Sequence, residues 1–204
     1  MRNRRDDIAA RTALARPIAS QIGGHLALDF CNTTGEHLAP RPDEMFLEWE
    51  SFVRWSAQIG LIGPEIYPEL LRHPSPIAKV VQLREAIYRV GLAISRGTPI
   101  PQRDLLVIRK QAKAPKPPVL AGVDGLRWRP DSSRAAQQLR AILATEALSL
   151  FCSPRSSRLG ICEGGHCGWL FIDESRGKRR RWCDMKDCGN RAKARRYYQQ
   201  QHGK

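Results

Sequence analysis

Several features that would place this chain in a common class of protein are missing from its sequence. No run of about 18 uncharged apolar residues occurs, so we expect no membrane-spanning helix. The arginines near the start are not followed by an apolar segment, which argues against a secretory signal and favours a cytoplasmic location. A glycine-rich phosphate loop, a nucleophile elbow and an HExxH motif are also absent, and we predict that the protein is not an enzyme.

Acidic residues are few compared with basic ones. The 204 residues include 20 Asp and Glu against 34 Lys and Arg, a net charge of +14. Residues 155–204 carry 13 basic and 5 acidic side chains, a net charge of +8, whereas the first 154 residues carry 21 and 15, a net charge of +6. This concentration favours a polyanionic partner such as nucleic acid, although a solvated basic surface would have the same composition.

Changes in composition divide the chain into three parts. A basic arm covers residues 1–20, an α+β domain covers 21–153 and a small module covers 157–204, with the boundary in the run Ser153-Pro154-Arg155-Ser156-Ser157. The alternation of Leu26, Leu28 and Phe30 predicts a strand over residues 25–31. Apolar spacing predicts a mostly helical domain with one small antiparallel hairpin over residues 119–128, and helices over residues 43–59, 76–97, 101–112 and 134–151.

The six cysteines are unevenly distributed. Cys162 and Cys167 form one C-x4-C pair, and Cys183 and Cys188 form a second pair fifteen residues later. Without a secretory signal, this pattern favours a metal over disulfides, and four thiolates suit a closed, structural Zn²⁺ site. Two disulfides, unrelated buried thiols, or His166 as a substitute ligand are the alternatives. The isolated cysteines are expected to pack in apolar surroundings; they are Cys31 and Cys152.

The stretch between the two cysteine pairs is predicted to be a hairpin. Residues 169–172 form its first strand, Gly177 lies in the turn, and residues 179–182 return. Three aromatic side chains are expected to cover the ion: Trp169, Phe171 and Trp182. So small a module has too little apolar surface to fold alone, and the metal is expected to stabilise it.

The module resembles the CGNR-type zinc finger, whose name matches the run Cys188-Gly189-Asn190-Arg191. Residues 168–173 and 180–183 match it as well. The N-terminal part resembles the ABATE-type domain through residues 26–33 and 83–87. The resemblance implies a bacterial transcription regulator whose treble-clef-like finger binds DNA.

Residues 190–201 contain no Pro or Gly and are predicted to form a basic helix anchored at the metal. A rigidly held helix of this charge suits a DNA groove, with phosphate contacts beside it. The predicted nucleic-acid contacts are Arg179, Arg180, Arg181, Arg191, Lys193, Arg195 and Arg196. Asn190 could instead cap the helix, Arg191 could form a local hydrogen bond to the backbone of the cysteine loop, and Tyr197 and Tyr198 are interpreted as packing residues.

Polar residues near the first predicted strand form a second candidate site. Asp29, Asn32 and Thr33, with Arg84 from the long helix, could line a pocket for a small-molecule effector, or could only end the strand with side-chain turns. The N-terminal domain would then sense a ligand or form a homodimer. An RNA- or protein-binding adaptor that uses the same finger is the alternative function, and an enzyme with its site in this domain is a third.

Overall fold

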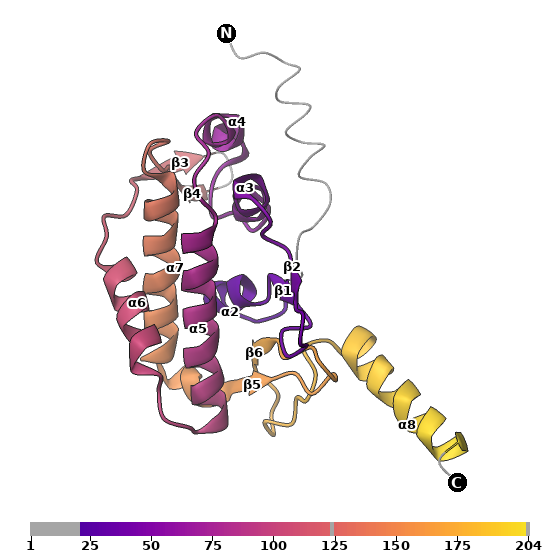
Figure 1. The fold of residues 1–204 in the computed structure, drawn as a ribbon. Coiled ribbons are helices and arrows are strands. Elements are labelled where there is room, and N and C mark those ends of the chain that lie inside the picture. Colours follow the sequence, from indigo (N-terminus) through magenta and orange to yellow (C-terminus); the bar gives the residue numbers. More distant parts are fainter. Residues whose placement is uncertain (1–20, 123–124, 203–204) are drawn as a thin grey trace.

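The computed structural model describes residues 21–122 and 125–202, so the predicted basic arm lies outside the described residues. Its body is a group of helices in which two long ones, α5 (Ala78–Arg96) and α7 (Ala135–Phe151), run beside α6 (Gln102–Ala112) (Figure 1). The short helix α2 (Leu26–Cys31) packs across α5 and α7. The other helical segments of the body are α3 (Trp49–Gln58), η1 (Pro64–Ile66), α4 (Tyr67–Leu71) and η2 (Pro154–Arg158).

Three two-stranded antiparallel sheets complete this part of the fold. They are β1 (Thr34–Gly35) with β2 (Asp43–Glu44), β3 (Val119–Gly122) with β4 (Gly125–Trp128), and β5 (Leu159–Ile161) with β6 (Leu170–Ile172). The predicted α+β class and the hairpin over residues 119–128 are therefore confirmed. None of the described helices is both long and apolar enough to span a bilayer.

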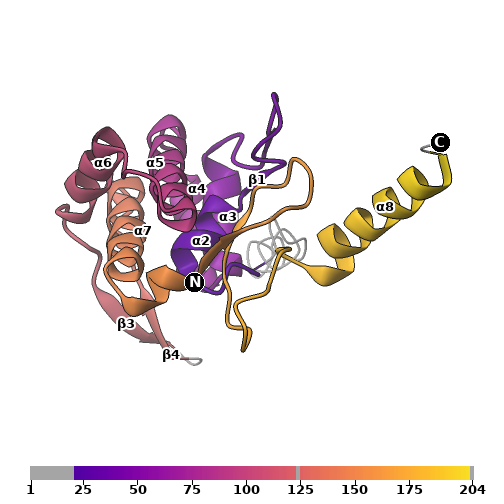
Figure 2. The ribbon, with the colours of Figure 1, turned by 90° about the horizontal axis from the view of Figure 1, so that it is seen from below.

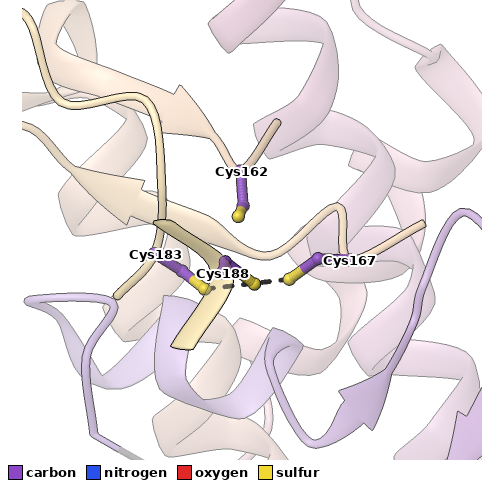
Figure 3. A group of neighbouring side chains, drawn as sticks. All are labelled: Cys162, Cys167, Cys183 and Cys188. Atoms are coloured by element: carbon purple, nitrogen blue, oxygen red, sulfur yellow. Dashed lines mark hydrogen bonds between the residues drawn. The ribbon is translucent and has the colours of Figure 1, made fainter. Parts of the chain in front are cut away.

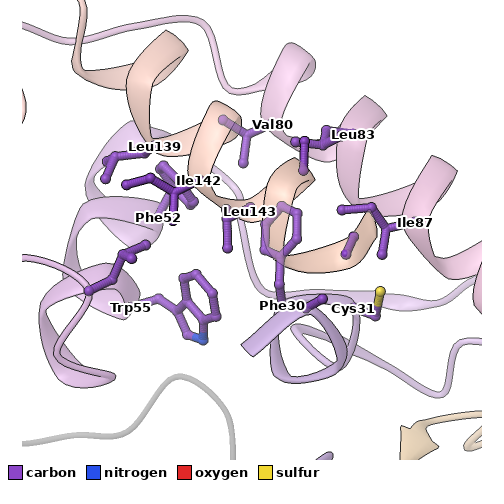
Figure 4. Close-up of a cluster of buried hydrophobic side chains, with 14 of the residues drawn as sticks. Phe30, Cys31, Phe52, Trp55, Val80, Leu83, Ile87, Leu139, Ile142 and Leu143 are labelled. Carbon is purple, nitrogen blue, oxygen red and sulfur yellow. The ribbon is translucent and has the colours of Figure 1, made fainter. Parts of the chain in front are cut away.

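One hydrophobic core joins the helices to the last sheet. Phe30 of α2 and Trp55 of α3 lie at its centre beside Leu143 of α7 (Figure 4), with ring centroids of the two aromatics 5.5 Å apart. Leu170 and Ile172 of β6 are buried in the same cluster. The predicted boundary at residues 153–157 is therefore a turn of the chain, while the β5–β6 hairpin packs as part of the body.

The strand predicted over residues 25–31 is wrong, because this segment forms helix α2. Ala27, Phe30 and Cys31 are all fully buried, and they follow one another at i, i+3 and i+4, the spacing of one helix face. The His25 imidazole accepts the Ala27 backbone N–H and caps the first turn. Leu28 is also buried, so apolar residues occur on more than one face of the helix, and in the sequence they alternate as they would in a strand.

The other predicted helices form close to their expected limits, with one late start. The segment predicted from residue 43 pairs first as β2, and α3 begins at Trp49 after a capping box between Glu48 and Ser51. Gly97 ends α5 in the left-handed conformation, with φ of 63°, at the limit predicted for this helix.

The return strand predicted over residues 179–182 is also wrong. β6 pairs instead with the upstream strand β5, with Ile161 opposite Leu170. The Asp173 carboxylate accepts the backbone N–H groups of Ser175 and Arg180, at 2.8 and 2.9 Å, and so closes residues 173–180 as a loop. The first cysteine pair consequently lies in the turn of the β5–β6 hairpin.

Asn32 joins the end of α2 to β6. Its side chain donates to the Leu170 carbonyl at 2.9 Å and accepts the Leu170 N–H at 3.0 Å. The neighbouring Trp169 indole donates to the Thr34 carbonyl at 2.7 Å, and the Tyr88 hydroxyl donates to the Gly168 carbonyl at 3.0 Å. The hairpin that carries the first cysteines is thus fixed to the helical body on two sides.

We expect Asn32→Ala to lower the free energy of unfolding by about 2–4 kcal/mol, because it leaves two buried backbone groups of Leu170 without partners. Urea unfolding monitored by circular dichroism measures the change. Asn190→Ala, at an exposed position, is the matched control and should lose less. Equal losses in the two variants would contradict a joining role for Asn32.

Candidate metal centre and nucleic-acid interface

The four cysteines of the C-terminal module converge on one point (Figure 3). Their sulfur atoms all lie within 4.8 Å of one another, and all four residues are buried. Sulfurs at the corners of a tetrahedron around zinc, about 2.3 Å from the ion, would be about 3.8 Å apart. The Sγ atoms of Cys167 and Cys183 are 3.7 Å apart, so the cluster fits a tetrahedral metal ion.

Different elements position the two pairs. Cys162 and Cys167 flank the turn between β5 and β6, whereas Cys183 lies in a loop and Cys188 in the π-helical turn η3 (Met185–Gly189). Gly164 is required in the first turn, because a Cβ there would lie 2.7 Å from the Cys188 sulfur. Gly165 next to it has φ of 75°, which favours glycine. Both glycines therefore let the first turn pass close to the sulfur cluster.

Hydrogen bonds within the cluster favour negative charge on the Cys162 sulfur and raise the pKa of the Cys167 and Cys183 thiols. Hydrogen bonds from the Cys167 and Cys183 thiols hold the pKa of the Cys162 thiol well below its usual value. The Arg191 guanidinium lies 3.2 Å from the Cys188 sulfur, and this contact raises the pKa of Arg191. Thiolates are the species that bind zinc, and four of them leave no open coordination position. A bound ion here would accordingly be structural.

Aromatic residues surround the sulfur cluster as predicted. Phe171 is fully buried against it, and Trp169 and Trp182 pack on it in part. The Arg180 guanidinium lies 4.3 Å from the Phe171 ring centroid, donates to the Ile22 carbonyl at 3.1 Å and also bonds to the Cys183 carbonyl. Arg180 thus fixes the loop before Cys183 and has a structural role.

The predictions for the remaining cysteines and for His166 have different outcomes. Cys31 is fully buried in the main core, which confirms its packing role. Cys152 is exposed, so its predicted packing role is wrong; it follows the last residue of α7, where the chain reaches solvent. His166 is exposed and lies outside the four-residue group.

Helix α8 (Asn190–His202) projects from the metal centre away from the helical body (Figures 1 and 2). Ala192 is buried, and residues 193–201 are exposed along their whole length. Lys193, Arg195 and Arg196 make no ion pair with the residues that the structure describes. Asn190 donates to the Lys186 carbonyl at 2.9 Å and so caps the preceding turn η3, whereas the sequence suggested that it could cap the helix that follows.

The other predicted nucleic-acid contacts are not equally available. Arg181 bonds to the Glu163 carboxylate, with 2.7 Å from Nε, and Arg191 lies 3.0 Å from Asp187. Arg191 is therefore held locally, but by the side chains of Asp187 and Cys188 and not by the backbone bond that the sequence suggested. Arg179 is exposed without an ion pair among the described residues.

Sequence reasoning missed three further exposed cations of the module, namely Arg176, Lys178 and Lys186. Lys186 lies between two cysteines of the cluster, Cys183 and Cys188, and that position alone could have indicated it. Tyr197 and Tyr198 are each 66% exposed, so their interpretation as packing residues is wrong. Both tyrosines lie on the part of α8 that leaves the body (Figure 1).

The four residues of the suggested ligand pocket are brought together only in part. Arg84 is buried, forms a two-point ion pair with Glu44 and lies 3.5 Å from the Thr33 hydroxyl. Asn32 faces Leu170 instead, and Asp29 accepts the Gly23 N–H at 2.8 Å. All four side chains hold neighbouring segments together.

Burial raises the pKa of Asp29 to about 6, against the opposing hydrogen bond from Gly23. The folded state then binds this proton more tightly than the unfolded state, so stability is lost as pH rises through about 4 to 6. We expect Asp29→Asn to raise the free energy of unfolding by roughly 1–3 kcal/mol at pH about 7.5 and by less at pH about 4.5. Urea titrations at the two pH values test this. Glu65→Gln, at an exposed carboxylate, should give no such pH-dependent gain.

We expect elemental analysis of the purified protein to find about one zinc ion per chain. Cys183→Ser removes a ligand and should lower both the zinc content and the temperature of thermal unfolding. Cys152→Ser changes an exposed cysteine outside the cluster and should leave both unchanged. Full zinc content in Cys183→Ser would contradict the assignment of the four ligands.

Comparison with known families covers nearly all of the described chain. The ABATE model, described as a putative stress-induced transcription regulator, matches residues 24–154, which is more than half of the chain. The CGNR zinc finger model matches residues 158–201. Both resemblances expected from the sequence are confirmed, in the expected order. No curated protein matches the chain.

Proposed function

Because the chain belongs to the ABATE family and ends in a CGNR zinc finger, we propose that it is a transcription regulator whose helix α8 binds duplex DNA. The ion of the four-cysteine centre is Zn²⁺ in this proposal. One observation carries it: a basic helix without a carboxylate projects from a buried metal centre and is exposed from residue 193 to residue 201.

The dimensions of α8 suit the major groove. An α-helix with its side chains is about 10–12 Å across, and the major groove of B-DNA is about 12 Å wide. Thirteen residues give a length of about 20 Å, enough to cross the groove. Because Cys188 lies just before the helix, the metal would fix the direction in which the helix enters.

The side chains of α8 offer both kinds of DNA contact. Lys193 and Arg196 lie on one stripe, at i and i+3, and Gln200 continues it one turn later. Lysine and arginine neutralise phosphates, while arginine and glutamine can also read base edges. Arg195 lies on the neighbouring stripe, beside Gly165 of the first cysteine turn. Arg179 extends the positive surface beyond the helix.

For the N-terminal domain we retain the proposal of an effector site, at a different place. A hollow of about 430 Å³ lies between the start of α2, the end of α3 and the β3–β4 hairpin. Its lining is mainly apolar, with Leu26, Leu61, Leu126 and Trp128 among its residues. A small apolar molecule suits such a lining better than a charged one.

Replacing Lys193, Arg195 and Arg196 together by Gln should weaken binding to duplex DNA by about 10- to 100-fold and reduce the salt slope by about 2–3. The matched control replaces Arg103, Arg109 and Lys110, three exposed cations of α6 on the far side of the molecule (Figure 2), also by Gln. It changes the net charge equally and should leave the salt slope nearly unchanged.

Fluorescence anisotropy at several salt concentrations measures both quantities, with zinc content as the check on folding. Equal losses in the two triple variants would show a nonspecific charge effect and contradict binding by α8. RNA of equal length is the second arm. Tighter binding of RNA than of duplex DNA would favour the adaptor function.

A further inference from the structure

A cleft beside the metal centre has properties that the proposed role of α8 does not use. Its volume is about 630 Å³, within the range of about 300–1,000 Å³ typical of small-molecule sites. Residues 179–186 form most of its lining, together with Ile22, and we call it the Arg179–Lys186 cleft. None of its lining residues belongs to α8.

The polar part of the cleft is strongly positive. Four of its lining side chains are cationic and one, Asp184, is a carboxylate. Arg179 and Lys186 make no ion pair with the residues that the structure describes, and both are exposed. Asp184 accepts the Lys186 backbone N–H at 2.8 Å and so serves the turn. An anionic group entering the cleft would therefore meet two cations without a carboxylate partner.

The apolar part offers a flat surface. Trp182 and Met185 line it, and Met185 is 45% exposed. The Arg181 guanidinium lies 5.4 Å from the Trp182 ring centroid, and its bond to Glu163 holds it there. Nucleic-acid bases stack on aromatic rings and on guanidinium planes. A planar ring would find a preformed surface of this kind.

We propose that the Arg179–Lys186 cleft binds a nucleoside phosphate. The phosphate contacts Arg179 and Lys186, and the base lies against Trp182 and Met185. Inorganic phosphate would leave the apolar part of the cleft unfilled, and an unphosphorylated nucleoside would leave its cations without an anion. The ligand is a free nucleotide or an unpaired nucleotide of a nucleic-acid strand, since both present the same groups.

The test uses the full-length protein loaded with zinc. Isothermal titration with adenosine 5′-monophosphate, adenosine and inorganic phosphate compares the three probes. The monophosphate should bind at least about tenfold more tightly than either of the others, and should shift the Trp182 indole N–H signal in NMR spectra. Equal affinity for monophosphate and inorganic phosphate, or no binding of monophosphate, would overturn the proposal.

Variants identify the site. Arg179→Gln with Lys186→Gln should weaken monophosphate binding at least about tenfold, while Arg103→Gln with Lys110→Gln on α6 should not. Trp182→Leu tests the surface for the base by the same measurement of monophosphate affinity. The zinc content of each variant confirms that it is folded. If the α6 pair weakens binding as much as the cleft pair, the assignment to the cleft is overturned.

Two further arms separate the sources of the ligand and the two proposals. A duplex with one unpaired 5′ nucleotide is compared with a blunt duplex to test whether the ligand is part of a nucleic-acid strand. If the unpaired nucleotide raises the affinity about tenfold, and the cleft variant abolishes this gain, the ligand is a nucleotide of a strand and not a free nucleotide. The α8 triple variant should keep its affinity for monophosphate. If this variant loses duplex binding but still binds monophosphate, the cleft acts separately from α8. If it loses both, the proposal that the cleft binds its ligand independently of α8 is contradicted.

Discussion

The meeting of four sulfur atoms at one point is the constraint on which the C-terminal half of this structure depends. Two of them belong to the β5–β6 hairpin, and the other two belong to the segment that leads into the basic helix α8. Within the described residues α8 buries little beyond Ala192, so its direction is set at the turn that holds Cys188. A tetrahedral ion would convert that turn into a rigid support.

The support itself is continuous with the core. Leu170 and Ile172 are buried among the helices, and Asn32 holds the backbone of β6. The backbone N–H of His37 also donates to the Cys167 carbonyl at 2.9 Å. A shift of α2 or of the loop after it would therefore displace the first pair of cysteines.

The arginines of the C-terminal module differ in whether they bond to other groups of the module or face solvent. Arg180 bonds to backbone carbonyls and lies on Phe171, Arg181 pairs with Glu163, and Arg191 pairs with Asp187 and Cys188. These three hold the module together. The cations of α8 beyond Arg191 have no carboxylate nearby in the described chain, and their charge is directed to solvent. A stretch with a large excess of basic residues thus contains both structural and available arginines.

The sequence by itself determined the group of four cysteines, the long helices and the basic C-terminal helix, because residue spacing along the chain is a local property. Only the tertiary structure decided that residues 26–31 are a helix, because burial on two faces hides its period. It also decided that β6 pairs upstream, that Arg180 is structural and that Asn32 joins the two parts of the chain. These outcomes depend on contacts between residues far apart in sequence, which form only in the folded core. Local sequence patterns do not indicate such contacts.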